Sequence, residues 1–483
     1  MMHEPPDGQN CCPLALAARR WGGAPFLRGA SGSCRSFAET DARALRMASA
    51  LVSQGVVPGE TVGIIPACPE EPLSWLPALW RTGVSVVVAD PKAPVAYTLA
   101  RFQSVNVRHV LGGEGEFTAL AARAGMGPLD PEGAAGDRGP FAWRTGDARL
   151  LVFTSGTSGA PKAAAHTVRT ACAAAGAAAN ALALAPGDRY LLTLPMHHVS
   201  GLSVLFRCLA SGAVCVLPDP ALTLAENITL SPVTHVSLVA AQLYRLLEEP
   251  AAVEALRRTK AVLLGGGPAP EALLARALGE GVPLMNSYGM TETGAMVCAT
   301  RPGAGLAELR TAGKPLVKNT LRLSAEGRIE MRGEFLFEGY YDNGVVMPPP
   351  ADGGWFRTGD LGEWDEEGRL VVTGRADRMF ISGGENIQPE AVETLLLGLE
   401  GVRRAAVVPV PDPVYGSVPA VFLDLEPGAV WDAVALREAL GGRLPRFAVP
   451  RLVLPWAAGA DSGIKPPLQK LIQIAEAWRS REG

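Results

Sequence analysis

The amino-acid sequence predicts an α/β protein of two domains. The large N-terminal domain is expected to hold stacked, mostly parallel sheets with helices and a small β-barrel-like part, and a small α+β domain follows it. A chain of 483 residues is too long for one ordinary hydrophobic core. In the first half, short β-rich runs alternate with helical stretches, which is typical of parallel sheets covered on both faces. After about residue 310 the pattern changes to short strands and tight turns.

The alternation begins with three apolar runs that are separated by stretches of helical character. Strands are expected at 62–65, 84–89 and 107–111, and helices at 42–54, 75–82 and 95–103. Residues 125–140 are rich in Gly, Pro and Asp and predict a surface excursion. A strand at 150–153 and an alanine-rich helix at 167–184 follow, and the small side chains of this helix predict close packing.

Two later strands, at 261–264 and 283–287, end in loops, and a helix that ends at 278 lies between them. The remaining elements are a hairpin at 361–373, helices at 389–400 and 431–442, and strands at 404–410 and 418–424. We therefore expect an N-terminal domain at 1–374 and a C-terminal domain at 379–483, with the boundary, which the family resemblance given below makes a hinge, at 375–378.

Composition and charge exclude several classes of protein. Hydrophobic residues make up 48% and charged residues 19% of the chain, and the formal net charge of −4 argues against a nucleic-acid or anionic-membrane partner. No apolar run is long enough for membrane insertion, and the N-terminus lacks the regions of a signal peptide. Eight scattered cysteines without a Cys-x-x-Cys pair predict reduced thiols in a cytoplasmic enzyme. The six histidines show no metal-ligand spacing, and the sequence leaves open whether the chain forms a homo-oligomer.

The segment that follows the strand at 150–153 predicts a phosphate-binding loop. Hydroxyls, glycines and one ammonium group can converge there on a polyanion, since glycine permits the backbone conformations of an anion-binding concavity. The loop is not a Walker A motif, because Pro161 precedes Lys162 and Ala163 follows it. A polar surface turn is the alternative. The candidate ligands are Thr154, Ser155, Gly156, Thr157, Ser158, Gly159 and Lys162.

Loops at 265–270 and 288–293 also follow strands, and open α/β sheets bind nucleotides at the carboxyl ends of their strands. Three shorter motifs complete the pattern. In chain order the six motifs are the phosphate loop, Gly265-Gly-Gly-Pro268, Tyr288-Gly-Met-Thr-Glu292, Thr358-Gly-Asp360, Gly374-Arg-x-Asp377 and Gly463-x-Lys465. This order resembles the acyl-adenylate-forming superfamily of acyl-CoA synthetases, adenylation domains and luciferases, over nearly the whole chain from about residue 35.

The resemblance implies an ATP site with magnesium. Tyr288 would stack on adenine, Thr291 would donate to the α-phosphate, and Glu292 would bind Mg²⁺, which is usually held by few carboxylates plus phosphate oxygens. Asp360 would bind the ribose hydroxyls, and Arg375 the ribose or a phosphate. The other implied ATP-binding residues are Gly265, Gly266, Gly267, Pro268, Ser287, Gly289 and Met290.

The resemblance also implies two half-reactions and a moving domain. A carboxylate must approach an anionic phosphate, which requires cationic and N–H donors, and a closing domain must exclude water. Lys465 would bridge the substrate carboxylate and the α-phosphate, and Asp377 would be the hinge residue. The CoA thiol would then enter along the backbone of Ser382, Gly383 and Gly384.

Within the superfamily the chain is most similar to the o-succinylbenzoate–CoA ligases of menaquinone synthesis. The segments that carry this similarity are 194–201, 234–247 and 379–390. Two departures are Ala240-Ala241, where a Pro-Thr pair is expected, and His197, where an apolar aromatic residue is common. The implied substrate is an aromatic keto acid with two carboxylates, only one of which reacts.

Four residues are candidates for the acyl site. An unpaired buried charge is costly, so the second carboxylate needs a partner, and Arg207 is the candidate. The alternative places Arg207 on a surface helix. His198 is expected to line the acyl channel rather than act as a base, and Ser200 and Gly201 belong to the same loop.

Three other functions stay open at this point. One is a ligase for another aryl or acyl acid such as benzoate, and another is a stand-alone adenylation domain that loads a carrier protein. The third is a catalytically silent nucleotide-binding regulator. The presence of both Glu292 and Lys465 argues against the regulator, because a pure binder needs no lysine from a second domain.

Overall fold

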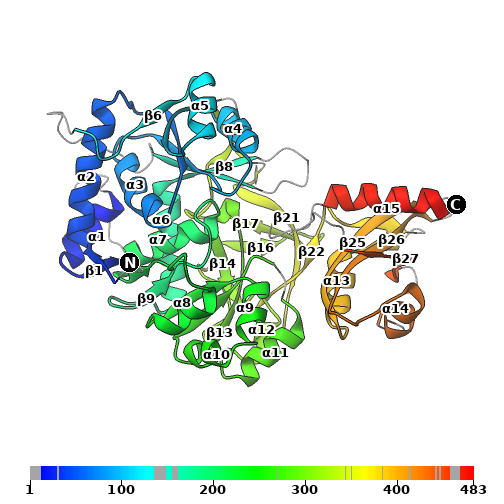
Figure 1. Ribbon diagram of the computed structural model, residues 1–483. Coiled ribbons are helices and arrows are strands. Elements are labelled where there is room, and N and C mark those ends of the chain that lie inside the picture. Colours follow the sequence, from blue (N-terminus) through cyan, green and yellow to red (C-terminus); the bar gives the residue numbers. More distant parts are fainter. Residues whose placement is uncertain are drawn as a thin grey trace.

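The computed structural model describes two bodies joined by a short connection (Figure 1). The described residues are 12–29, 32–134, 148–154, 162–267, 269–342, 344–349, 351–382, 385–412, 415–440, 443–444, 448–456 and 468–482. The large body contains three sheets with their helices, and the small body is an α+β domain at the C-terminus. This arrangement confirms the predicted fold class.

The first sheet has eight strands in the order β19-β18-β8-β7-β4-β3-β5-β6, and the strands from β7 to β6 are parallel. Helices α4 and α5 cover one face, while α2 and α3 pack on the other. The strands are β3 Thr61–Ile65, β4 Ser85–Val88, β5 Val107–Gly112, β6 Gly127–Leu129, β7 Arg149–Phe153, β8 Ala163–Thr167, β18 Gly339–Asp342 and β19 Val345–Met347. The helices are α2 Phe37–Ser53, α3 Glu70–Trp80, α4 Val95–Ser104 and α5 Glu116–Arg123.

The amino-acid sequence explains the burial and the starting points of these elements. All four residues of β4 are buried, as expected for a central parallel strand between two helical layers. Helix α2 begins at Phe37, earlier than predicted, because Ser36 and Glu39 form a reciprocal capping box. The expected surface excursion at 125–140 is wrong in part, since β6 pairs with β5 there, and its last residues lie outside the described part of the chain.

The second sheet has nine strands in the order β15-β14-β13-β12-β11-β9-β10-β1-β2. Helices α8 to α12 cover its outer face. The strands are β1 Pro25–Arg28, β2 Cys34–Ser36, β9 Arg189–Leu191, β10 Val214–Val216, β11 His235–Leu238, β12 Ala261–Leu264, β13 Leu284–Met290, β14 Ala295–Ala299 and β15 Lys314–Pro315. The helices of this half are α1 Pro13–Trp21, α6 Val168–Ala181, α7 Val199–Ser211, α8 Leu224–Leu230, α9 Ala240–Leu246, α10 Pro250–Arg257, α11 Glu271–Gly279 and α12 Leu306–Leu309.

One apolar core joins the two large sheets. It contains residues of both sheets together with the buried faces of α6 and α7. The buried residues of α6 are nearly all alanine, so that α7 can approach it closely, as the sequence predicts. This shared core fixes the position of one sheet relative to the other, and the candidate site draws residues from both.

A third, antiparallel sheet stands where the sequence predicts a small β-barrel-like part. Its strands are β16 Leu321–Leu323, β17 Arg328–Met331, β20 Ala351–Asp352, β21 Trp355–Trp364 and β22 Leu370–Arg375. Strand β21 pairs with β17, β20 and β22, and the pairings of the described strands leave the sheet open rather than closed as a barrel. The β21–β22 hairpin confirms the one predicted at 361–373.

The small body packs helices on both faces of a three-stranded sheet. Helices α13 and α14 cover one face, and α15 covers the other. The elements are β23 Phe380–Ser382, β24 Glu385–Ile387, α13 Pro389–Leu397, β25 Val402–Asp412, β26 Gly416–Leu425, α14 Ala433–Leu440, β27 Leu452–Pro455 and α15 Leu468–Glu482. Away from the connection the two bodies touch where the Tyr244 hydroxyl of α9 donates to Glu426 Oε1 at 2.9 Å.

The described helices were compared with the length and apolar character of a membrane-spanning helix. None of them combines the length and the apolar character that a membrane span requires.

Candidate active site

The predicted phosphate loop is closed at its base by hydrogen bonds between its two ends. The Thr154 N–H donates to the Lys162 carbonyl at 2.8 Å, and the Thr154 hydroxyl lies 3.3 Å from the same oxygen. Strands β7 and β8 on either side are antiparallel neighbours, so the loop is the turn of a hairpin. The tip residues Ser155, Gly156, Thr157, Ser158 and Gly159 lie outside the described residues.

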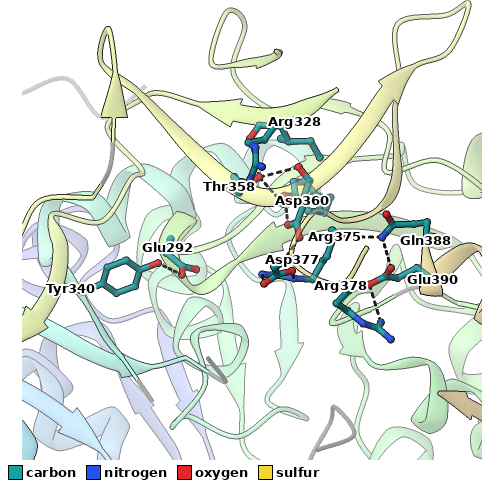
Figure 2. A network of polar contacts seen from close by, with 12 residues as sticks. Glu292, Arg328, Tyr340, Thr358, Asp360, Arg375, Asp377, Arg378, Gln388 and Glu390 are labelled. Atoms are coloured by element: carbon teal, nitrogen blue, oxygen red, sulfur yellow. Dashed lines mark hydrogen bonds and ion pairs between the residues drawn. The ribbon is translucent and has the colours of Figure 1, made fainter. Parts of the chain in front are cut away.

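A tyrosine connects the end of this loop with the predicted magnesium ligand. The Lys162 ammonium lies 5.3 Å from the centre of the Tyr340 ring, a cation–π distance. The Tyr340 hydroxyl donates to Glu292 Oε1 at 2.7 Å, as Figure 2 shows. Burial and the Glu292 charge raise the pKa of Tyr340 well above its ordinary value, so this hydroxyl remains a donor. Lys162 therefore lies over the ring of the same tyrosine whose hydroxyl binds Glu292.

Glu292 belongs to a single 3₁₀ turn, η1 Thr291–Thr293, that is bonded from two sides. His166 of β8 lies with Nε2 2.6 Å from the Thr291 carbonyl, and the Phe337 N–H donates to the Glu292 carbonyl at 2.9 Å. The Glu292 side chain is 7% exposed. A carboxylate held beside the predicted phosphate loop fits Mg²⁺, because that ion combines one or two carboxylates with substrate phosphate oxygens.

The predicted adenine-binding residues lie along β12 and β13. Ser287 ends the predicted strand, whereas Tyr288, Gly289 and Met290 were expected in a loop but continue β13, which pairs with β14 through Met290. Gly289 is required here, because a Cβ atom would lie 1.8 Å from the Ala295 carbonyl oxygen. Ser287 Oγ donates to the Leu264 carbonyl at 2.9 Å. Strand β12 is followed directly by Gly265, Gly266 and Gly267, and Pro268 lies outside the described residues.

Tyr288 and Asp360, predicted to bind adenine and ribose, are joined by a hydrogen bond. The Tyr288 hydroxyl donates to Asp360 Oδ2 at 2.6 Å. Burial, together with the Asp360 charge, raises the pKa of Tyr288 well above its ordinary value. Stacking of the Tyr288 ring on adenine stays a prediction, and the bond to Asp360 fixes the far end of that ring.

Asp360 lies in a strand where its backbone and side chain are both held (Figure 2). Its N–H donates to the Thr358 hydroxyl at 3.1 Å, and Arg328 Nη1 donates to the Thr358 carbonyl at 3.1 Å. Arg375 Nη1 reaches Asp360 Oδ1 at 3.1 Å. Gly359 makes that approach available, because a Cβ there would lie 2.6 Å from Arg375 Nη2. The structure thus brings together the two residues predicted to contact ribose.

Arg375 also binds the predicted hinge residue. Its Nε and Nη2 donate to the two oxygens of Asp377 at 2.8 and 2.7 Å, a bidentate ion pair. Hydrogen bonding to Asp377 raises the pKa of Arg375 further above its ordinary value, although burial opposes the shift. One guanidinium therefore connects the predicted ribose carboxylate with the predicted hinge.

On the other side of the hinge, Gln388 and Arg378 form a second set of contacts (Figure 2). Gln388 Nε2 donates to the Arg375 carbonyl at 3.0 Å and to Glu390 Oε2 at 2.5 Å. Arg378 Nη1 donates to Glu390 at 2.8 Å, and its Nη2 donates to Glu393 at 2.6 Å. Arg378 is thereby fixed to α13, while Gln388 reaches back across the hinge.

His197 and His198 lie together immediately before α7, with ring centres 4.4 Å apart. Burial, with the neighbouring His198, lowers the pKa of His197 to about 4, and burial also lowers the pKa of His198. Both rings are therefore neutral at pH 7. Next along this helix, Ser200 accepts a bond from Ser203 through its carbonyl, and a Cβ on Gly201 would lie 2.2 Å from the Pro195 oxygen.

Arg207 is buried in the interior, 2% exposed, two turns into α7. The alternative that placed it on a surface helix is therefore wrong. Its Nη1 donates to the Tyr190 hydroxyl at 3.0 Å, and that hydroxyl lies 2.7 Å from Ser237 Oγ. Its buried Nε has no hydrogen-bond partner among the described residues. A buried guanidinium with unused donor capacity favours an anionic ligand.

Several predicted residues cannot be placed in this geometry. Ser382 is buried on β23, whereas Gly383, Gly384 and Lys465 lie outside the described residues. Conversely, sequence reasoning did not find His166, Tyr340 or Gln388. His166 had a visible signal, since it is a polar residue that ends an alanine run in an interior strand. Tyr340 had none, because its partner Glu292 is 48 residues away. Gln388 had none, because its bond to the Arg375 carbonyl depends on how the two bodies meet.

Comparison with known proteins agrees with this geometry. Residues 14–341 match the AMP-binding enzyme family, and residues 391–457 match the AMP-binding enzyme C-terminal domain. The chain is 34% identical over 407 residues to the 2-succinylbenzoate–CoA ligase of Salmonella typhimurium, covering 84% of each chain. The chain belongs to the AMP-binding enzyme family, whose members include acyl-adenylate-forming ligases.

Solved structures extend the similarity to the whole fold. o-Succinylbenzoate CoA synthetase (MenE) from Bacillus subtilis, in complex with the acyl-adenylate intermediate OSB-AMP, has a TM-score of 0.85 and 28% identity, covering 95% of this chain and 97% of that one. The same enzyme in complex with ATP and magnesium ion has a TM-score of 0.81 and 29% identity, covering 92% and 95%.

We predict that acid destabilises this part of the protein through His166. Burial lowers the pKa of His166 to about 4, below the value of about 6.5 expected in the unfolded chain. As the pH falls through this window the unfolded chain binds the proton first, so stability is lost on acidification. Between pH 7.5 and pH 5 this one residue should cost on the order of 2 kcal/mol. Urea unfolding at both pH values should show a smaller loss in His166→Gln than in the wild type, and equal losses would contradict the assignment.

Proposed function

We propose that the chain is an AMP-forming acid–CoA ligase that converts o-succinylbenzoate, ATP and CoA into o-succinylbenzoyl-CoA, AMP and pyrophosphate in menaquinone biosynthesis. The observation that carries the substrate class is the buried Arg207, whose Nε has no partner among the described residues. It supplies the positive charge that a second, non-reacting carboxylate needs. The chemistry rests on the family and on the Asp360–Arg375 and Lys162–Glu292 groupings.

In the first half-reaction, a carboxylate oxygen attacks the α-phosphorus of ATP, and the bond to pyrophosphate breaks. Thr291 and Lys465 would donate to the oxygens on which negative charge accumulates. Tyr288, Asp360 and Arg375 would hold the nucleoside, and the phosphate loop the β- and γ-phosphates. Mg²⁺ bound through Glu292 would neutralise charge on the phosphates. The carboxylate is already ionised at neutral pH, so the neutral His198 needs to accept no proton.

In the second half-reaction, the CoA sulfur attacks the acyl carbonyl, AMP leaves, and the thiol proton passes to solvent. Lys465 must leave before the thiol arrives, which requires the C-terminal domain to turn about Asp377. The backbone of Ser382, Gly383 and Gly384 would then line the thiol path. Because ATP and CoA are intracellular substrates, we place the reaction in the cytoplasm.

The test of the function is a pyrophosphate-release assay over several acids, with detection of the thioester. We expect o-succinylbenzoate with ATP and CoA to give AMP, pyrophosphate and o-succinylbenzoyl-CoA in equal amounts. Robust turnover of benzoate or a fatty acid and none of o-succinylbenzoate would overturn the substrate and leave the reaction class. Transfer to a carrier protein but not to CoA would overturn the ligase assignment.

Arg207 is predicted to select the second carboxylate. Arg207→Met keeps most of the volume and removes the charge, so kcat/KM for o-succinylbenzoate should fall about 10- to 100-fold, the range for hydrogen bonds to charged groups. The matched control is Tyr190→Phe, which removes the hydroxyl partner of Arg207 and keeps the guanidinium. The comparison substrates are benzoylpropionate and 2-butyrylbenzoate, each lacking one carboxylate. If Arg207→Met lowers kcat/KM as much for the analogue that is turned over as for o-succinylbenzoate, Arg207 has a structural role only.

Lys465 and Asp377 are predicted to act in different half-reactions. Lys465→Ala should slow acyl-adenylate formation by about 10²- to 10³-fold, the usual cost of one preorganised donor, and should spare thiolation of supplied acyl-adenylate. Asp377→Pro should do the reverse, since proline fixes φ and restricts the residue before it. Single-turnover assays of each step measure both.

The control for the hinge variant is Asp377→Ala, which removes the ion pair with Arg375 but leaves the backbone free. It should affect thiolation less than Asp377→Pro does. If Lys465→Ala slows both half-reactions equally, the proposed domain alternation is wrong.

A further inference from the structure

His166 joins the strand after the phosphate loop to the turn that carries Thr291 and Glu292. Its Nε2 lies 2.6 Å from the Thr291 carbonyl oxygen, and its Nδ1 lies 3.1 Å from the Thr170 hydroxyl. A carbonyl can only accept, so Nε2 carries the proton and Nδ1 is an acceptor. Nδ1 shares the single proton of the Thr170 hydroxyl with the Thr167 carbonyl, which lies 3.0 Å from the same oxygen. His166 is 2% exposed, and burial keeps it neutral at the pH of the reaction.

The position of His166 in the sheet determines which elements the bond to Thr291 connects. His166 lies four residues after Lys162 on β8 and is paired with Leu150 of β7, so it belongs to the hairpin that presents the phosphate loop. Along its other edge β8 pairs with β18, where Ala164 of β8 lies opposite Tyr340. Strand β18 follows Phe337, whose N–H binds the Glu292 carbonyl, and contains Tyr340, whose hydroxyl binds the Glu292 side chain.

The turn is therefore bonded by two neighbouring segments, and His166 supplies the bond from the phosphate-loop strand. The other two bonds come from Phe337 and Tyr340 and do not involve Thr291. Misplacement of a reacting group by about 1 Å can cost about 10²-fold in rate. Among the described side chains, His166 makes the contact that fixes the position of Thr291 relative to the phosphate loop.

We propose that His166 is a positioning residue for the adenylation step, holding Thr291 and Glu292 in register with the phosphate loop. The inference rests on the proposed function, because it assigns the effect to the ATP-dependent half-reaction. His166 is not a general base, since both ring nitrogens are engaged within the protein. Its loss should disturb the magnesium–ATP geometry and leave the acyl site and thiolation unaffected.

The experiment compares two amides of different reach, His166→Gln and His166→Asn. The Gln amide nitrogen can reach the position of Nε2 and donate to Thr291, whereas the shorter Asn amide reaches only the Nδ1 position. We expect His166→Asn to slow single-turnover adenylation about 10- to 100-fold. It should also raise the Mg²⁺ concentration for half-maximal rate several-fold. His166→Gln should recover most of both, and urea unfolding of the two variants reports whether each is folded.

Thiolation of supplied acyl-adenylate should stay within about twofold of the wild type in both variants, because no reacting group of that step touches His166. Equal effects of Gln and Asn on adenylation, or equal slowing of both half-reactions, would overturn the positioning role. Adenylation is followed with whichever acid supports ATP–pyrophosphate exchange. A wild type inactive on o-succinylbenzoate would therefore refute the proposed substrate and still allow His166 to be tested.

Discussion

The antiparallel pairing of β8 with β7 on one side and with β18 on the other is the interaction on which the site depends. The first pairing closes the phosphate loop at Thr154 and Lys162, and the second places Tyr340 beside that loop. Because His166 and Tyr340 both reach the Thr291–Glu292 turn, these strands also hold residues from the second sheet. Two sheets that share one core are thereby locked together at the point where the phosphates would bind.

Arg375 supplies the second organising contact, since its guanidinium is shared between Asp360 and Asp377. Ribose hydroxyls that bound Asp360 would compete for the oxygen that Arg375 now contacts. Nucleotide binding and hinge position would in this way be linked through one side chain, as coupling between sites requires a shared element whose state both can bias. Gln388 adds a bond to the Arg375 carbonyl across the proposed hinge, which the proposed rotation about Asp377 would have to break.

Much of the fold and part of the site could be predicted from the sequence. Local signals were sufficient for β3, β4, β5, the alanine-rich α6 and the β21–β22 hairpin, because apolar periodicity and turn residues are short-range properties. Residues 288–290 were misassigned as a loop, since their pairing with β14 makes them a strand. Glu292 and Asp360 could be found from motif order, whereas Tyr340 and Gln388 could not, because their roles arise from strand register and domain contact.

The proposed role of Arg207 in substrate selection rests on its interior position and on its incomplete set of contacts. A guanidinium has five N–H donors, and removing it from water without partners for them is costly. Tyr190 engages Nη1, but Nε has no partner among the described residues. Replacing Arg207 by an apolar residue would remove this cost from the free protein. It would also remove the positive charge that a bound dicarboxylate needs. A substrate that brings the missing charge is therefore bound more strongly than one that leaves the guanidinium unpaired, which is how a buried polar group discriminates between acids.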